Sequence, residues 1–264
     1  MFVTNAGVRI YYEVEGTGPT ILFHTGAGGD HRIWKYAGYV AALQGYRKIL
    51  VDQRGRGFSD RPSTIESHRM EWFVSDVCAV LDDVGVESVR FWGYSNGALV
   101  GVAFGSAYPK RLRVLVGIGS LPFQNFSDLP RPVDPKGEIE RMVSAGGVNA
   151  DVKLHTERTK ERFPEAIEKN VLGGDPLMYA LDDLAWNEWR GPLEAYPTLH
   201  VPVLVVAGEL EDSKRQTEKS ITKLPNGRLV RIPGIGHLSA FYRSDLVLPH
   251  VLPFLEQTIK GDKS

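Results

Sequence analysis

The sequence is poor in three features that each point to a particular class of protein: cysteine, long apolar runs and charge of one sign. Of 264 residues only Cys78 is a cysteine, which excludes an internal disulfide, and its apolar helical surroundings predict a place in the core. No apolar run approaches about 18 residues, so no membrane-spanning helix is expected. The formal net charge is −1, which gives no basic face for nucleic acid or for an anionic membrane surface.

Leader and cofactor motifs are missing as well. The opening residues, MFVTNAGVRI, show neither the basic nor the apolar segment of a secretory signal, so we expect a cytoplasmic protein. The glycine-rich stretch TGAGGD at residues 25–30 matches neither the G-x-x-x-x-G-K-[ST] loop nor the G-x-G-x-x-G turn. No histidines or cysteines are paired at metal-ligand spacing. We therefore expect no cofactor and no metal ion, and a small molecule as the substrate.

Short apolar runs bounded by turn residues alternate with helical patterns along the chain. With 42% apolar and 24% charged residues, the composition is that of an ordinary globular protein. Strands that are apolar throughout and alternate with helices indicate a mostly parallel sheet with helices on both faces. The expected strands cover residues 8–14, 20–24, 48–52, 88–92, 113–118, 203–207 and 228–232.

Helices are expected between these strands, and one of them follows Ser95 and runs through Tyr108. Apolar residues at helical spacing predict a helix over 70–84, ended by Gly85. A closing helix is expected over 243–259, where Pro249 and Pro253 kink it or delay its start.

The alternation stops between residues 122 and 197. A proline-rich entry, LPRPVDPKG, leads into helical patterns near 138–145, 152–160, 164–171 and 175–189, and no strand is evident there. We interpret residues 122–197 as a helical cap inserted between two parts of one core, residues 1–121 and 198–264. Ligands of open α/β sheets bind at the carboxyl edge of the strands, so the cap is expected over that edge.

A serine lies between two glycines where an expected strand gives way to a helix. Gly93-Tyr94-Ser95-Asn96-Gly97 fits G-x-S-x-G, and in a strand–turn–helix setting this pattern is a nucleophile elbow. The turn exposes the serine Oγ at a helix N-terminus, where the dipole favours developing negative charge.

A serine hydroxyl needs a base, and the base needs an orienting carboxylate. His237 follows the last expected strand in the loop PGIGHLSAF, at the same sheet edge as Ser95. The strand at 203–207 is followed by GELED, in which Glu211 and Asp212 compete for the role of the acid. The resulting chain order, serine then acid then histidine, is the one expected for this architecture.

An oxyanion hole requires preorganised N–H donors. One donor is the backbone N–H of Asn96, the residue after the candidate nucleophile. The second is expected from the loop after the strand TILFH, where Thr25, Gly26 and Ala27 are the candidates.

Taken together, five segments resemble the α/β-hydrolase fold superfamily, in its serine-hydrolase form with a helical cap. They are FHTG at 23–26, VDQRGRGFSDRP at 51–62, GYSNG at 93–97, VPVLVVAGELED at 201–212 and IPGIGHLS at 232–239. The resemblance implies a sheet of about eight strands, with Ser95 as nucleophile and His237 as base.

The resemblance also ranks the open candidates. The acid in this family usually stands three residues after the strand-ending glycine, which implies Glu211, with Asp212 as the alternative one residue later. The second oxyanion donor usually stands two residues after the histidine of the first loop, which implies Gly26. Thr25 departs from the common His-Gly pair, so Thr25 and Ala27 stay open. The loop 52–57 is expected to be architectural, with Asp52 and Arg54 tying loops together.

The expected activity is hydrolysis of a small, mostly apolar carboxylic ester or lactone through an acyl-enzyme. Three alternatives stay open: a C–C bond hydrolase, a haloperoxidase-like member, and a slow-turnover small-molecule receptor. Ser95 disfavours haloalkane dehalogenase and epoxide hydrolase chemistry, since those relatives carry an aspartate at the elbow. A monomer or homodimer is expected. The candidate substrate-lining residues are His31 and Tyr94 near the site, and Met142, Phe163, Met178, Tyr179, Trp186 and Trp189 in the insertion.

Overall fold

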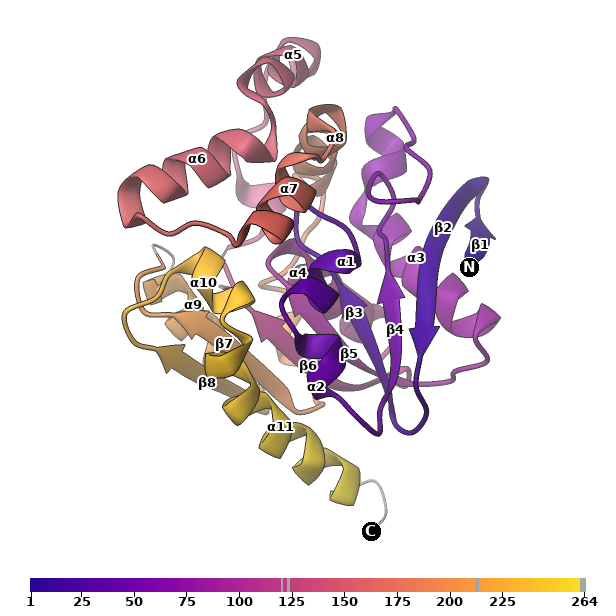
Figure 1. Cartoon of the computed structure of the whole chain (residues 1–264). Helices are drawn as coiled ribbons and strands as arrows, with labels where there is room; N and C mark the ends of the chain where they lie inside the picture. The colour runs from indigo at the N-terminus through magenta and orange to yellow at the C-terminus, as the bar shows by residue number, and fades with distance from the viewer. Residues whose placement is uncertain (120, 123, 212–213, 262–264) are drawn as a thin grey trace.

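An eight-stranded sheet runs through the centre of the protein in the computed structural model, which describes residues 1–119, 121–122, 124–211 and 214–261 (Figure 1). The strand order is β1-β2-β4-β3-β5-β6-β7-β8. β1 and β2 pair antiparallel at one end, and all other neighbours are parallel except β2 with β4. The strands are β1 (Phe2–Asn5), β2 (Val8–Glu15), β3 (Thr20–His24), β4 (Arg47–Val51), β5 (Val89–Tyr94), β6 (Leu112–Ile118), β7 (Val203–Gly208) and β8 (Gly227–Ile232).

Helices pack on both faces because neighbouring residues of a central strand point to opposite sides. Leu22 and Phe91 belong to one buried cluster, and the next residues, Phe23 and Trp92, belong to the other. The first cluster is completed by α3 (Met70–Asp83) and α4 (Asn96–Ala107). The second is completed by α1 (Arg32–Tyr36), α2 (Tyr39–Ala42), α10 (His237–Tyr242) and α11 (Ser244–Gly261). The remaining core helix, α9 (Lys214–Ile221), lies between β7 and β8 in the chain. The predicted α/β class is confirmed.

The expected strands and long helices agree with the structure to within one or two residues, and the differences have local causes. β1 was missed because its four residues alternate between exposed and half-buried positions at the sheet edge and form no apolar run. The short helices α1, α2, α9 and α10 were not expected. α11 continues through Pro249 and Pro253. Its apolar face, which includes Val247 and Val251, is fully buried and offsets the backbone hydrogen bonds that the prolines remove.

Helices fill the chain between β6 and β7, and its described residues contain no strand. Figure 1 shows α5 to α8 above the carboxyl ends of the central strands. Asp134 and Asp175 cap α5 and α8 through side-chain hydrogen bonds, each followed by a proline at the first helical position. The helical elements are η2 (Phe126–Asp128), α5 (Pro135–Ala145), α6 (Val148–Thr159), α7 (Glu165–Leu172), α8 (Pro176–Trp186) and η3 (Tyr196–Thr198).

A buried ion-pair network ties these helices to the loop after β4. Asp182 on α8 accepts from Arg56 Nη2 at 2.7 Å and lies 2.6 Å from His68 Nδ1, at the end of η1 (Ile65–His68). All three side chains are at most 4% exposed. In the same loop Asp52 accepts from the His31 N–H, and Arg54 pairs with Asp76 on α3. The loop is thus held on several sides.

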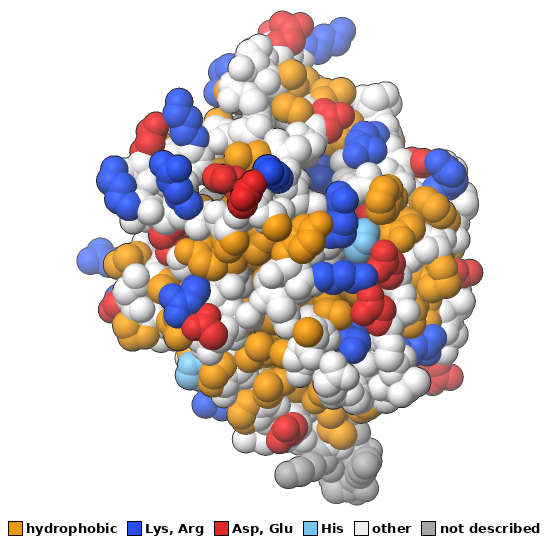
Figure 2. All heavy atoms as spheres, in the orientation of Figure 1, with side chains coloured by type: hydrophobic (Ala, Val, Ile, Leu, Met, Phe, Trp, Pro, Cys, Tyr) orange, Lys and Arg blue, Asp and Glu red, His pale blue; other side chains and the backbone are white. Residues whose placement is uncertain are grey.

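Charges of both signs are interspersed over the face drawn in Figure 2. Among the described helices, none is both long enough and apolar enough to cross a bilayer.

Candidate active site

Ser95 stands at the sharp turn from β5 into α4. Its φ of 52° and ψ of −121° lie in a region that serine rarely adopts. The Ser95 N–H still donates to the Ile118 carbonyl of β6 at 2.8 Å, so the turn begins while the strand is still paired. The flanking glycines are required by close approach. A Cβ on Gly97 would lie 2.3 Å from the His24 carbonyl oxygen, and one on Gly93 would lie 2.4 Å from the Ala98 nitrogen.

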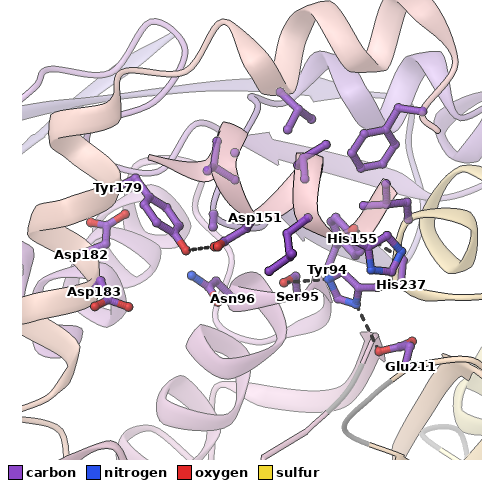
Figure 3. Close-up of a pocket in the computed structure, with 18 of the residues that line it drawn as sticks. Tyr94, Ser95, Asn96, Asp151, His155, Tyr179, Asp182, Asp183, Glu211 and His237 are labelled. Atoms are coloured by element: carbon purple, nitrogen blue, oxygen red, sulfur yellow. Dashed lines mark hydrogen bonds and ion pairs between the residues drawn. The ribbon is translucent and has the colours of Figure 1, made fainter. Parts of the chain in front are cut away.

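Three side chains from distant parts of the chain meet at this turn (Figure 3). His237 Nε2 lies 3.1 Å from Ser95 Oγ, and His237 Nδ1 lies 3.1 Å from Glu211 Oε2. Glu211 is 5% exposed, and its other oxygen, Oε1, accepts the Gly208 N–H at 2.8 Å. The spacing is that of a nucleophile, a base and an orienting acid. The competing acid, Asp212, lies outside the described residues.

The charge of Glu211 governs the protonation of His237. Burial by itself lowers the pKa of His237, but the charge and hydrogen bond of Glu211 and the charge of Glu161 raise it above the ordinary 6.5. His237 therefore holds a proton more strongly than a free imidazole does.

The imidazole is enclosed by two close neighbours. The Tyr94 ring stacks on it with centroids 5.1 Å apart, and the Tyr94 hydroxyl lies 3.4 Å from the His237 carbonyl oxygen. Gly119, with φ of +97°, passes beside the ring, where a Cβ would lie 2.7 Å from His237 Cε1. These contacts restrict the ring to the orientation that faces Ser95.

The loop after β3 lies against the elbow. A Cβ on Gly26 would lie 3.0 Å from Ser95 Cβ, and Ala27 lines the cavity in front of the serine. Gln53 Nε2 donates to the Gly26 carbonyl at 3.2 Å, and Arg56 Nε donates to the Ala27 carbonyl at 2.8 Å. Both carbonyls therefore point toward the β4 loop. The Gly26 carbonyl and the Ala27 N–H belong to the same trans peptide, so the Ala27 N–H points in the opposite direction. Asn96 directly follows Ser95 as the first residue of α4, so its N–H is one of the donors at the N-terminus of the helix.

Burial keeps the loop histidine neutral. His24 is 1% exposed, and this burial lowers its pKa to about 4. Its Nδ1 lies 3.1 Å from the Thr25 carbonyl. A neutral, buried ring of this kind supports the loop.

A cavity of about 470 Å³ opens in front of Ser95, between the sheet edge and the helices α6 to α8. Its apolar wall comes mostly from those helices and from the loops that flank them. Besides Ser95, Glu211 and His237, the lining residues are Ala27, Gly28, Tyr94, Asn96, Phe126, Val148, Asp151, Val152, Leu154, His155, Arg158, Phe163, Val171, Tyr179, Asp182, Asp183, Trp186 and Leu238.

Four of the eight candidate lining residues lie at this cavity: Tyr94, Phe163, Tyr179 and Trp186. The other four are placed elsewhere among the described residues. Met178 is turned toward the β4 loop and packs on Gly55, and Trp189 stacks on Phe126 beyond the end of α8. Met142 is half-buried on α5, and His31 is enclosed by Asp52 and Glu13. These four expectations are corrected.

The lining residues that sequence reasoning missed lie mainly on α6. Val148, Asp151, Val152 and His155 follow one another at i, i+3, i+4 and i+7, the spacing of one helix face. The face was overlooked because it mixes apolar with polar residues and because the helix was expected to begin at Val152. The helical spacing of these residues could have revealed the face, but the face has no continuous hydrophobic stripe.

One end of the cavity carries carboxylates. The Tyr179 hydroxyl donates to Asp151, whereas Asp182 is already paired with Arg56 and His68. Burial, followed by the charges of Asp151, Glu138 and Asp182, raises the pKa of Asp183. This end is therefore polar, and the apolar part of the wall includes Val148, Val152, Phe163 and Val171.

Among the described side chains, one trio has atoms close enough to hold a metal ion: Asp30, His31 and Asp52. His31 Nδ1 lies 2.8 Å from Asp52 Oδ1, and its Nε2 lies 3.1 Å from Glu13 Oε1. Asp30 pairs with Arg32. Since carboxylates occupy both imidazole nitrogens, the trio is arranged as an ion-pair network. The absence of a metal stays a prediction.

Comparisons with known proteins agree with this architecture. BpoC of Mycobacterium tuberculosis, which is named as a non-heme bromoperoxidase, is 25% identical over 94% of this chain and 97% of its own. An esterase from Thermogutta terrifontis has a TM-score of 0.78 at 23% identity, covering 98% of each chain. The enol-lactonase of Burkholderia xenovorans LB400 has a TM-score of 0.77 at 23% identity, covering 97% of this chain and all of its own. A family model of the alpha/beta hydrolase fold matches residues 19–244, and the chain belongs to that family.

Proposed function

We propose that the protein is a serine hydrolase that cleaves a small, mostly apolar carboxylic ester or lactone through an acyl-enzyme. The observation that carries the proposal is the continuous contact from Ser95 Oγ to His237 Nε2 and from His237 Nδ1 to Glu211, at the mouth of a 470 Å³ cavity. An esterase and an enol-lactonase share the fold over nearly the whole chain and add support.

In the proposed mechanism His237 takes the proton of Ser95, whose Oγ attacks the substrate carbonyl. Glu211 holds the imidazole in the tautomer that carries hydrogen on Nδ1 and stabilises the imidazolium that forms. The leaving oxygen then receives the proton from His237. Water, deprotonated by the same imidazole, resolves the acyl-enzyme and regenerates Ser95.

The tetrahedral oxyanion is proposed to accept the N–H of Asn96 and one N–H of the first loop. Gly26 remains the first choice because its Cα lies against Ser95, and Ala27 is the alternative because it lines the cavity. Each such donor contributes on the order of 3 kcal/mol to lowering the barrier.

A panel of p-nitrophenyl esters and lactones tests the proposal. Wild type is expected to turn over short or medium apolar members, and Ser95→Ala is expected to lose at least about 10³-fold in kcat/KM with an unchanged melting temperature. A fluorophosphonate adduct on Ser95, located by mass spectrometry, is the second readout. Full activity in Ser95→Ala would overturn the assignment.

A second activity is favoured by the similarity to BpoC over 94% of the chain. In this reaction hydrogen peroxide replaces water in resolving the acyl-enzyme, which releases a peracid and free Ser95; the peracid then oxidises bromide. Bromination of a phenolic dye in acetate with peroxide, absent from Ser95→Ala, is the expected sign. Hydrolysis without any peroxide-dependent bromination would contradict this second activity and leave ester or lactone hydrolysis as the only proposed reaction.

A further inference from the structure

Glu161, in the loop between α6 and α7, touches the segment that carries His237. Its Oε1 accepts the Gly236 N–H at 2.6 Å, and Gly236 is the residue directly before His237. Its Oε2 lies 2.7 Å from His155 Nε2, and His155 lines the cavity on α6. A Cβ on Gly236 would lie 2.5 Å from that same Oε2, so a side chain at this position would displace the Glu161 carboxylate.

These contacts join the helical insertion to the loop that bears the base. The Glu161 side chain is 10% exposed and lies 75 residues from Gly236 along the chain. His237 projects from the first residue of α10, so the position of the Gly236 peptide sets the origin of the imidazole. A shift of about 1 Å in a reacting group is enough to cost about 100-fold in rate.

Glu161 also brings a second negative charge to the base. Burial by itself raises the pKa of Glu161, but hydrogen bonds from His155, Ser239 and the Gly236 N–H lower it to about 2. The carboxylate is therefore ionised at neutral pH. Its charge is one of the causes that raise the pKa of His237.

We propose that Glu161 is a positioning residue for His237: it anchors the Gly236 peptide from the helical insertion and adds a second carboxylate, beside that of Glu211, to the surroundings of the imidazole. The helical insertion thereby sets both the place and the strength of the base. The inference rests on the proposed function, in which His237 deprotonates Ser95.

The sign of the effect follows from the groups around the imidazole. The titratable or charged side chains at this end of the site are Glu211 after β7, Glu161 and His155 in the insertion, Tyr94 on β5 and Arg158 on α6. Removing the Glu161 charge lowers the pKa of His237. The neutral imidazole then persists to lower pH, and the acid limb of the rate profile moves to lower pH.

The test is the second-order rate of fluorophosphonate labelling of Ser95 as a function of pH, with kcat/KM for p-nitrophenyl acetate beside it. Glu161→Gln retains the shape and an acceptor for the Gly236 N–H, and its acid midpoint is expected to fall by about half a pH unit. Glu161→Ala loses the anchor as well, and its rate at the optimum is expected to fall about tenfold. Glu157→Gln, an exposed change on α6, is the matched control and should behave as wild type.

The outcomes separate this inference from the proposed function. Labelling of wild type but not of Ser95→Ala, combined with a wild-type pH profile in Glu161→Gln and a wild-type rate at the optimum in Glu161→Ala, overturns the role of Glu161 and leaves the hydrolase assignment standing. Equal labelling of wild type and Ser95→Ala overturns the hydrolase assignment itself. Melting temperatures show whether each variant is folded, and the Glu161→Gln profile decides because that change preserves the side-chain volume.

Discussion

Ser95 illustrates how a single residue is held in an unfavourable backbone conformation for the sake of its side chain. A non-glycine residue at φ of 52° costs on the order of 1–3 kcal/mol. The cost is offset by the packing of α4, whose residues from Gly97 to Gly105 are all buried. The conformation presents Oγ to the cavity and leaves the Ser95 N–H bonded to β6.

The acid of the candidate triad can be separated from its neighbour by two amide substitutions. Glu211→Gln removes the charge that stabilises the imidazolium and favours the wrong imidazole tautomer, so kcat/KM should fall on the order of 10³-fold. Asp212→Asn is the matched control and should stay within a few-fold of wild type. A larger loss in Asp212→Asn than in Glu211→Gln would reassign the acid.

The pH dependence of the rate tests the environment of His237. Its pKa is raised, and the base acts in its neutral form, so kcat/KM should decline on acidification with a midpoint above 6.5. Glu211→Gln should move that midpoint to lower pH, because the charge of Glu211 and its hydrogen bond raise the pKa of His237. The measurement is kcat/KM for a substrate without titratable groups; a midpoint below 6.5 in wild type would contradict the assignment.

At the scale of elements, α8 is attached to the core by a buried charge. Asp182→Ala leaves the Arg56 guanidinium, 2% exposed, without its carboxylate, and should lower the free energy of unfolding by about 3–5 kcal/mol. Asp183→Ala on the same helix removes an exposed carboxylate and should change stability by less than about 0.5 kcal/mol.

Urea unfolding of the two variants side by side gives the comparison. The contrast is informative because the residues are adjacent, belong to one helix and both line the cavity. Equal and small losses would show that the buried pair with Arg56 does not hold α8 in place.

At the scale of the whole molecule, the cavity exists only because the helical insertion covers the sheet edge. Val148 on α6 lines it, whereas Val143 on α5 is exposed. Val148→Phe should shorten the acyl chain that the enzyme accepts, with the kcat/KM ratio of the longest to the shortest p-nitrophenyl ester falling about tenfold or more. Val143→Phe should leave the ratio unchanged. An unaltered chain-length profile in Val148→Phe would place the acyl group elsewhere.

The class of the fold was predictable from the sequence because the buried strands of a parallel α/β sheet appear as short apolar runs. The central strands are mostly apolar, as in TILFH of β3 and VLVVAG of β7. The antiparallel edge strand β1 and the short helices show no comparable apolar run, so they were not predicted.

The sequence by itself determined that Ser95, His237 and an acid of the loop GELED, either Glu211 or Asp212, should meet, since each follows a parallel strand and all such loops emerge at one edge of the sheet. Only the tertiary structure decided what surrounds them. In the structure Met178 packs on Gly55, and α6 lines the cavity with both polar and apolar residues. Glu161 accepts a hydrogen bond from the Gly236 N–H. These contacts depend on how elements far apart in the chain pack together, and no local periodicity records that packing.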